Sequence, residues 1–447
     1  MKRYSRIFKL THFQIFKLCS FALCFILFSS TMTFAQEFSK KLFEKYDNYK
    51  EPSITHRRFK HADIQPVIQS LVFEKQQIGE SFEGRSISQI TLGTGKTKVL
   101  LWSQMHGDEA TATMAIFDIF RFFNTKGDGF DAEKEAILKN CTLYFVPMLN
   151  PDGAERFQRR TATDIDMNRD ALRLQTPEGR LLKKLQNELM PEFAFNLHDQ
   201  NVRYSAGMTK HQATISFLAT AYNFPREWNE VRTRSMQVIC DMKETLQQFI
   251  PNNIAKYSDE HEPRAFGDNI QKWGSSLILI ESGGYLDDRE KQFIRKLNFT
   301  AILSALNSIA NRSYTKYKLA DYEVIPNNEK YLFDLLIRNA SFVKGDKIIK
   351  KDIGINLIEK NTAGAKGFYL KSVIEDMGDL STFWGIKELD ATGLLVQPFN
   401  NFPELKAQYN IANEYADDTM FEEPANFILT KNGEIAYIIV NGSVVGK

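Results

Sequence analysis

Between residues 78 and 308 the chain alternates short, almost continuously apolar runs with longer segments whose apolar residues recur at helical spacing. The apolar runs are SISQITLG, KVLLWSQ, CTLYFVPML, EFAFNLH and SLILIES. The helical segments include EATATMAIFDIFRFF and PEGRLLKKLQNELM. Near-continuous apolar strands are typical of sheets that are buried on both faces. The pattern therefore predicts an α/β fold in which helices cover both faces of one sheet.

Polar motifs follow four of these predicted strands, at the point where each strand ends. They are HGDE after KVLLWSQ, NPDG after LYFVPML, HDQ after FAFNL, and ESGG after LILI. In α/β sheets, ligands bind beyond the carboxyl ends of the strands. We therefore expect the functional site at this edge of the sheet.

The pattern changes near residue 318, where short β-rich runs begin to alternate with Gly, Asn and Asp turns. The segment LTKNGEIAYIIV predicts a hairpin with Asn432 and Gly433 in its turn. No His follows His261, so no metal site is expected here. We predict a catalytic domain over residues 36–318 and a small β-rich C-terminal domain over residues 319–447, for which the sequence indicates no chemistry.

The first 35 residues have the layout of a secretory signal peptide. A basic stretch, MKRYSRIFKLTHFQIFK, precedes the apolar CSFALCFILFSSTMTFA, and small residues lie before Gln36. A retained membrane anchor is the alternative, but Ser and Thr leave the run short of the ~20 apolar residues that a spanning helix needs. We predict cleavage near Ala35, export to the periplasm or medium, and no membrane span in the mature chain.

Removing this segment changes the charge and the cysteine count. Residues 1–35 hold five of the 57 Lys and Arg, which leaves 52 basic residues against 55 Asp and Glu. No basic patch remains, so nucleic acid is not an expected partner. Of the four Cys, only Cys141 and Cys240 stay in the mature chain. We expect two buried thiols rather than a disulfide, although an exported protein could form one.

Two of the seven His directly follow an apolar strand, His106 and His198. Glu109 lies three residues after His106, at the start of a predicted helix. Two His and one Glu with an open fourth position form a common catalytic zinc site. A lone HxxE is more often a solvated helix start. The support for a metal site therefore comes from the motifs that follow it.

These motifs are NPDG (150–153), DMNRD (166–170), LHDQ (197–200) and ILIESGG, in that order after HxxE. Over Ile78 to Ser308, beginning with IGESFEGRSI, the chain resembles the zinc carboxypeptidases, the funnel-type metallocarboxypeptidases of family M14. The resemblance implies a mixed, largely parallel sheet and one Zn²⁺ per chain. It also implies that the zinc ligands are His106, Glu109 and His198.

The resemblance assigns further roles. Glu281 matches the general base, which takes the proton of a zinc-bound water and passes it to the leaving amine. Asn168 and Arg169 match the pair that holds the terminal carboxylate of a substrate. Arg159 matches the arginine that stabilises the oxyanion, with an uncertainty of one residue because Arg160 is adjacent.

Other positions are less closely tied to the family. Tyr257 is a candidate substrate-binding tyrosine on its position alone. Many members carry Arg where this chain has Asp108, which we expect to orient a ligand His rather than to bind metal. Asn150 to Gly153 are interpreted as a structural turn that shapes the site.

The leading hypothesis is an exported zinc metallopeptidase that hydrolyses a peptide or amide bond next to a free carboxylate. The alternative is an amidase of cell-wall peptides or acylated amino acids with the same chemistry. An inactive binding protein is disfavoured, because both His, both Glu, Asn168 and Arg169 are present. An adhesin built on the C-terminal domain is disfavoured for lack of an aromatic row. The sequence leaves open the side-chain preference, the role of the C-terminal domain and the oligomeric state.

Overall fold

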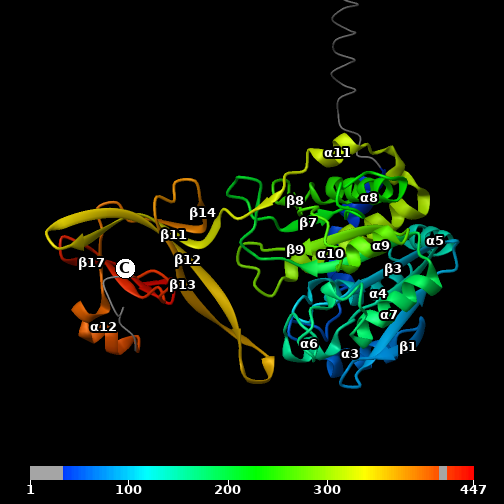
Figure 1. The fold of residues 1–447 in the computed structure, drawn as a ribbon, viewed down its shortest axis with the longest axis horizontal. Helices are drawn as coiled ribbons and strands as arrows, with labels where there is room; N and C mark the ends of the chain where they lie inside the picture. The colour runs from blue at the N-terminus through cyan, green and yellow to red at the C-terminus, as the bar shows by residue number, and fades with distance from the viewer. Residues whose placement is uncertain (1–33, 412–419, 447) are drawn as a thin grey trace, which may run out of the picture.

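The computed structural model describes residues 34–411 and 420–446, which form two units, each built on one large sheet (Figure 1). Most of the predicted signal peptide lies outside the described residues. The predicted cleavage point after Ala35 falls at the start of α2 (Phe34–Glu44). No helix in the described part of the chain combines the length and the apolar character that crossing a membrane requires.

The first sheet has the strand order β1-β2-β4-β3-β5-β9-β7-β8. Its centre is parallel, since β3 runs parallel to β4 and β5, and β5 runs parallel to β9. Antiparallel pairs occur toward both edges. The bounds are β1 (Glu74–Glu80), β2 (Ser86–Leu92), β3 (Thr97–Ser103), β4 (Cys141–Val146), β5 (Phe193–Asp199), β7 (Ile215–Leu218), β8 (Ile254–Lys256) and β9 (Ser276–Ser282). The mixed, largely parallel α/β sheet is therefore confirmed.

Alternate side chains of β3 enter two different cores, one on each face of this sheet. Val99 and Leu101 belong to the larger core, and Leu100 and Trp102 to the smaller one. Helices α2, α3 (His61–Ser70), α4 (Thr111–Asn124), α5 (Asp131–Asn140), α8 (Glu230–Leu246) and α10 (Gln292–Asn311) contribute to the larger core, and α7 (Pro177–Leu189) and α9 (Phe266–Lys272) to the smaller. Burial on both faces explains why the central strands are almost continuously apolar.

The second unit is a sheet with the strand order β13-β12-β11-β15-β16-β17-β18, and β14 also pairs with β11. Asn432 and Gly433 both have positive φ in the turn between β16 and β17, which confirms the predicted hairpin. The bounds are β11 (Leu332–Lys344), β12 (Lys347–Asn361), β13 (Phe368–Gly378), β14 (Trp384–Asp390), β15 (Leu395–Gln397), α12 (Pro403–Gln408), β16 (Phe427–Lys431), β17 (Glu434–Val440) and β18 (Ser443–Gly446).

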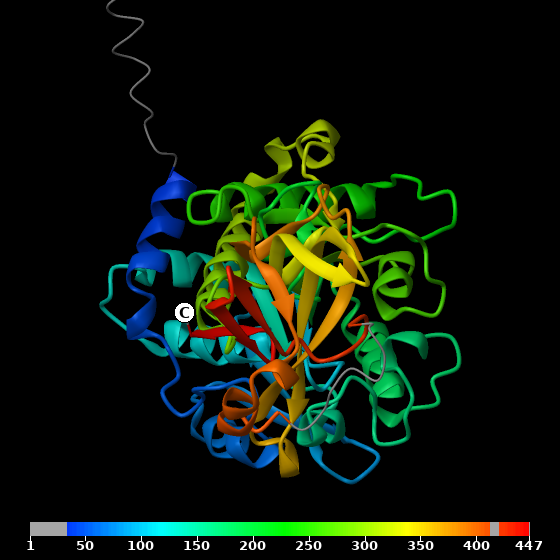
Figure 2. The ribbon, with the colours of Figure 1, turned by 90° about the vertical axis from the view of Figure 1, so that its left-hand side faces the viewer.

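The connection between the units begins with α11 (Leu319–Glu323), which packs on α8. Tyr322 and Ile325 lie in the larger core of the first unit, so this core extends past residue 318. The connection also contains the short strand β10 (Asn328–Glu329), which pairs with β6 (Ser205–Ala206) of the first unit. The division into domains at residue 318 stays a prediction. Figure 2 shows the second unit in front of the middle of the first.

Cys141 and Cys240, at the start of β4 and within α8, are buried free thiols. Burial raises the pKa of each thiol to about 12. These are the properties of packed, unreactive cysteines.

Candidate metal centre

His106 and Glu109 lie in the tight turn that joins β3 to α4. Gln104 has a positive φ at the end of β3, and the Glu109 amide donates to the His106 carbonyl at 3.1 Å. A side chain at Gly107 would collide with the Gly153 backbone, because a Cβ there would lie 1.9 Å from the Gly153 carbonyl carbon. Only glycine lets the two turns approach this closely.

His198 reaches the same place from β5. The three side chains are buried, and their ligand atoms all lie within 4.8 Å of one another. His106 Nδ1 lies 2.8 Å from Glu109 Oε1, and His198 Nδ1 lies 2.6 Å from Glu109 Oε2. One carboxylate therefore stands between two imidazoles, each facing it with the same ring nitrogen.

The three groups of the cluster shift one another's pKa in different directions. Burial lowers the pKa of His198, which keeps its ring neutral. Burial opposes ionisation of Glu109, but the neighbouring His106 and His198 hold the pKa of Glu109 well below its usual value. Burial would lower the pKa of His106, yet the charge of Glu109 and hydrogen bonding to Asp166 and Glu109 raise it to about 9. Two imidazoles and a carboxylate in a buried cluster are a donor set that zinc accepts, so the residues fit the expected metal.

Asp166 orients His106, a role that the sequence analysis gave to Asp108. Asp166 Oδ1 lies 3.1 Å from His106 Nε2, the ring nitrogen turned away from Glu109. In the described residues no hydrogen bond joins the Asp108 side chain to either His, and Asp108 Oδ1 is buried without a partner. Burial and the nearby Glu109 charge raise the pKa of Asp108 to about 6. The expectation for Asp108 is therefore wrong, because Asp166 and not Asp108 makes the hydrogen bond to the His106 ring.

Glu281 lies on β9 directly beside His198 of β5, and the two residues are register partners in the parallel pair. The side chain is buried. Burial, and next the charge of Glu109, raise the pKa of Glu281 well above its ordinary value. A carboxyl group with a raised pKa beside a cluster of metal-ligand type is suited to proton transfer near neutral pH.

Arg159, and not Arg160, points into the cluster. Arg159 Nη1 lies 3.1 Å from His106 Nδ1 and 3.4 Å from Glu109 Oε1, and its Nε donates to Asp166 Oδ2 at 3.1 Å. Arg160 instead donates to the Asp164 carbonyl. Of the two adjacent arginines, Arg159 is thus the one that contacts the cluster, and its role at the oxyanion stays a prediction.

Asn168 and Arg169 lie in the short helix η2 (Met167–Arg169), next to Asp166. The Asn168 side chain accepts a hydrogen bond from the Phe266 amide at 2.9 Å. Arg169 is partly exposed and lies 3.2 Å from a Glu262 oxygen, and Arg264 contacts the same carboxylate at 2.7 Å. Arg169 is thus held by an anion already present in the chain, and Arg264 forms an ion pair with Glu262.

Tyr257 is half-buried and packs edge-on against Tyr204, with ring centroids 6.3 Å apart. Both residues line a small pocket of about 400 Å³. Burial raises the pKa of Tyr257, and the charge of Glu281 raises it further. Its role in binding substrate stays a prediction.

The side chains of the NPDG turn hold neighbouring segments of the chain in place. The Asn150 side chain accepts from the Gly153 amide at 2.9 Å and donates to the Met105 carbonyl at 3.2 Å, next to His106. Asp152 accepts from Ser81 at 2.7 Å and from Arg85 at 2.7 Å. The turn at the start of α6 (Pro151–Arg156) thus connects the IGESFEGRSI segment to the backbone that carries His106.

A buried ion pair that the sequence did not predict lies next to His198, at Asp199. Lys291 Nζ lies 3.0 Å from Asp199 Oδ2 and donates to the Ser282 carbonyl at 2.8 Å. Thr111 donates to the same Asp199 oxygen at 2.6 Å. Asp199 follows His198 and Ser282 follows Glu281, so Lys291 connects the ends of the two strands that carry these residues. Nothing in the sequence around Lys291 signals this contact.

Comparison with known proteins bears out the resemblance seen in the motifs. Residues 69–237 match the family model for zinc carboxypeptidases. Over this segment the chain is therefore similar to the zinc carboxypeptidases. The segment includes His106, Glu109, Arg159, Asn168, Arg169 and His198, whereas Glu281 lies beyond its end.

Curated relatives include the Carboxypeptidase 2 proteins of two Trichophyton species. The chain is 29% identical to that of T. tonsurans over 132 residues, which are 27% of this chain and 23% of the relative. It is 31% identical to that of T. rubrum over 106 residues, which are 23% of this chain and 19% of the relative. The matches thus span about a fifth of the length of these relatives.

Solved structures with a related arrangement include a metallo-carboxypeptidase from Burkholderia cenocepacia. It is 17% identical, with a TM-score of 0.45, over 57% of this chain and 69% of that one. A second is the metallo-carboxypeptidase from Pseudomonas aeruginosa in complex with (2-guanidinoethylmercapto)succinic acid. It is 15% identical, with a TM-score of 0.44, over 57% of this chain and 69% of that one.

Proposed function

We propose that the protein is an exported zinc metallopeptidase of the carboxypeptidase type, which hydrolyses a peptide or amide bond next to a free carboxylate. The observation that carries the proposal is the buried cluster of His106, Glu109 and His198 with Glu281 beside it. The family match over residues 69–237 supports the same reaction class.

His106, Glu109 and His198 would hold the zinc, and Asp166 would fix the His106 ring from behind. Zinc, when bound, supplies Lewis-acid chemistry that acidifies a water molecule and polarises a carbonyl. Glu281 takes a proton from the attacking water and delivers it to the leaving amine, for which its buried position and raised pKa are suited. Arg159 carries a positive charge at the cluster and would stabilise the oxygen on which negative charge develops.

Asn168 and Arg169 would bind the substrate's free carboxylate. A guanidinium group donates two parallel hydrogen bonds to the two oxygens of a carboxylate, which fixes the chain end relative to Glu281. In the structure Arg169 forms an ion pair with the Glu262 carboxylate, and a substrate carboxylate would replace Glu262 in this contact. Tyr257 would contribute a further contact to the substrate.

An amidase of cell-wall peptides or acylated amino acids is the second candidate. Its motivation is Asp108, which stands where many relatives carry a substrate-binding Arg and which lines the mouth of the site. A catalytically inactive binding protein is disfavoured, because the three candidate metal ligands, Glu281 and Arg159 are all present at the site.

The test combines a metal measurement with a pair of matched peptides. Purified mature protein should hold one zinc per chain by atomic absorption. It should release the last residue of a peptide with a free C-terminus and cleave the amidated form of the same peptide far more slowly. Absence of stoichiometric zinc would contradict the mechanism. Equal cleavage of both peptides would remove the role of Arg169 and favour the amidase.

Export is tested separately, by sequencing the N-terminus of the protein made in a cell with a secretory pathway. We expect the mature chain to begin at or near Gln36, with the protein outside the cytoplasm. Recovery of a chain that still begins with Met1 would contradict this part of the proposal.

A further inference from the structure

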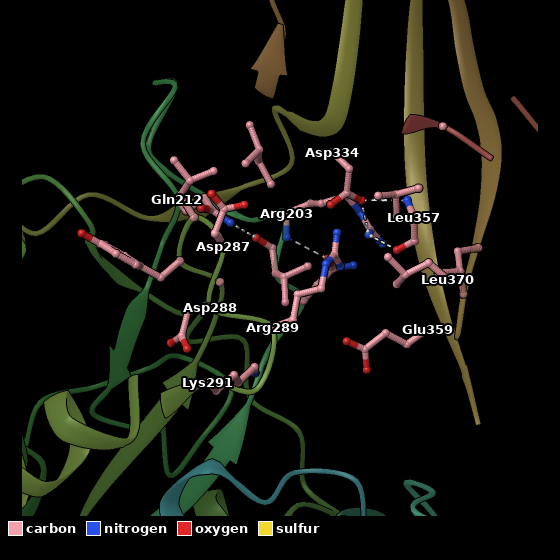
Figure 3. Close-up of a pocket in the computed structure, with 18 of the residues that line it drawn as sticks. Arg203, Gln212, Asp287, Asp288, Arg289, Lys291, Asp334, Leu357, Glu359 and Leu370 are labelled. Carbon is pink, nitrogen blue, oxygen red and sulfur yellow. Dashed lines mark hydrogen bonds and ion pairs between the residues drawn. The ribbon is translucent and has the colours of Figure 1, made fainter. Parts of the chain in front are cut away.

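A cleft of about 1110 Å³ lies between the two units, and both contribute to its walls. Figure 3 shows residues of the loop after β9, such as Asp287, Asp288 and Lys291, on one side. Asp334, Leu357 and Leu370 of the second sheet lie on the other side. Pockets for small ligands usually measure about 300–1,000 Å³. This cleft therefore holds more than a single amino-acid side chain.

The cleft begins at the candidate metal centre. Its lining includes Asp108 and Glu109 at one end, together with Asp199 and Gln200 beyond His198. It continues to Gly442, Ser443 and Val444 at the far end of the second sheet. A ligand anchored at the metal centre thus has one continuous space leading outward between the two units.

Ion pairs between the units border this space and keep both walls in place. Arg57 and Arg58 of the first unit contact Glu359 of β12 at 2.8 and 2.9 Å, and the Arg58 guanidinium lies 4.1 Å from the Phe157 ring and 4.3 Å from that of Phe368. Arg203 contacts Asp334 of β11 at 3.0 Å. In these contacts charged side chains of the lining pair with one another, which leaves the exposed apolar side chains of the two walls available to a ligand.

Large apolar side chains are exposed on both walls. Tyr285 and Leu286, a few residues after Glu281, are 37% and 51% exposed. Ile358 of β12 and Val444 of β18 are 39% and 45% exposed, and all four line the cleft. Exposed apolar side chains that face one cavity from two sides are typical of a ligand-binding site.

We propose that the cleft binds the part of a peptide substrate that lies upstream of the scissile bond, so that the C-terminal unit forms one wall of the substrate site. The inference rests on the proposed function and adds a substrate class, extended oligopeptides rather than single acylated amino acids. Ile358 and Val444 are then residues that determine specificity for long substrates, although they lie far from the metal centre in sequence.

The test compares two substrates that share the same last two residues. One is acylated directly on that pair, and the other carries six further residues upstream. We expect a higher kcat/KM for the long substrate. Ile358→Ser should lower the ratio of long to short kcat/KM by roughly three- to tenfold, since it removes part of an apolar contact. The matched control is Ile348→Ser on the same strand, because Ile348 is 70% exposed and does not line the cleft.

Val444→Ser on β18 is the second variant and should change the ratio in the same direction. Binding of the fluorescently labelled long peptide to the Glu281→Gln protein, followed by anisotropy, gives a measurement independent of turnover. An unchanged ratio and unchanged binding in both cleft variants would overturn the inference while leaving the proposed function intact. If neither substrate is hydrolysed by wild-type protein, the proposed function fails, and peptide binding alone decides whether the cleft is a binding site.

Discussion

The two sheets of this protein bury their strands differently. In the first sheet every residue of β9, and all but the last residue of β5, is buried. In the second sheet β12 is exposed at both ends and buried only in its middle. The first sheet lies between two layers of helices, whereas much of the second is open to solvent on one side.

This difference decides where ionisable groups change their properties. His198, Glu109 and Glu281 sit at the ends of the buried strands, where loss of water and mutual charge shift the pKa of each. On the second sheet, Glu359 has a shifted pKa because Arg57 and Arg58 come from the first unit. The proposed chemistry thus uses groups of the first unit, and the proposed role of the second unit is to add a wall to the substrate site.

The largest expected effect comes from Glu281→Gln. Gln keeps the size of the side chain but cannot take up a proton, so hydrolysis should fall by about 10²–10⁴-fold. Zinc content should stay at the wild-type value, because Glu281 is not among the three clustered donors. Steady-state kinetics with parallel metal analysis measures both, and Glu188→Gln on the exposed face of α7 is the control. Full activity in the Glu281 variant would show that the site works through another base.

Asp166→Asn should weaken zinc binding by about 10–100-fold, since it loosens the hold on His106 Nε2. Competition with a chromogenic chelator gives the affinity. Asp164→Asn is the control, because Asp164 is exposed, lies two residues away and has a positive φ that Asn tolerates. Equal affinities in the two variants would mean that Asp166 has no part in holding the metal.

Glu359→Gln tests the contact between the units and should lower the free energy of unfolding by about 1–2 kcal/mol. Burial opposes ionisation, but Arg57 and Arg58 hold the pKa of Glu359 below its ordinary value. A carboxylate whose pKa is lowered by folding stabilises the protein fully at pH values above its pKa in the unfolded chain, about 4.3 for Glu. This stabilisation is lost as the pH falls through the lower pKa of the folded state. The difference in free energy of unfolding between Glu359→Gln and wild type, measured with urea, should therefore be largest at pH 7 and decrease in acid.

The exposed Glu434→Gln on β17 is the control for this experiment and should match wild type at every pH. A constant difference between the Glu359 variant and wild type from neutral pH into acid would argue against an ionic contact.

The smallest effect is expected in the second unit itself. Gly433→Ala should cost about 1 kcal/mol, because Gly433 has a φ of 87° in the hairpin turn and a Cβ disfavours that conformation. Gly367→Ala is the control, since φ is not positive there and a Cβ would meet Thr362 at an ordinary 3.4 Å. Thermal unfolding of both variants measures the difference, and equal midpoints would show that the turn does not limit stability.

The sequence by itself determined the elements and the identity of the chemical groups. Strands buried on both faces must be apolar along their length, so the first sheet is visible as a series of apolar runs. The polar motifs that follow these runs predicted which edge holds the site, and the Asn432-Gly433 pair predicted its hairpin through backbone sterics. These features depend on neighbouring residues only.

The tertiary structure decided which of these groups face one another. Asp166 reaches His106 across 60 positions of sequence, while Asp108, only two residues from His106, makes no hydrogen bond to it in the described part of the chain. Arg159 turns toward Glu109, Arg160 turns away, and Lys291 connects the ends of two strands. The cleft between the units depends on how two sheets pack. Side-chain direction and long-range contact follow from the path of the whole chain, which local sequence does not specify.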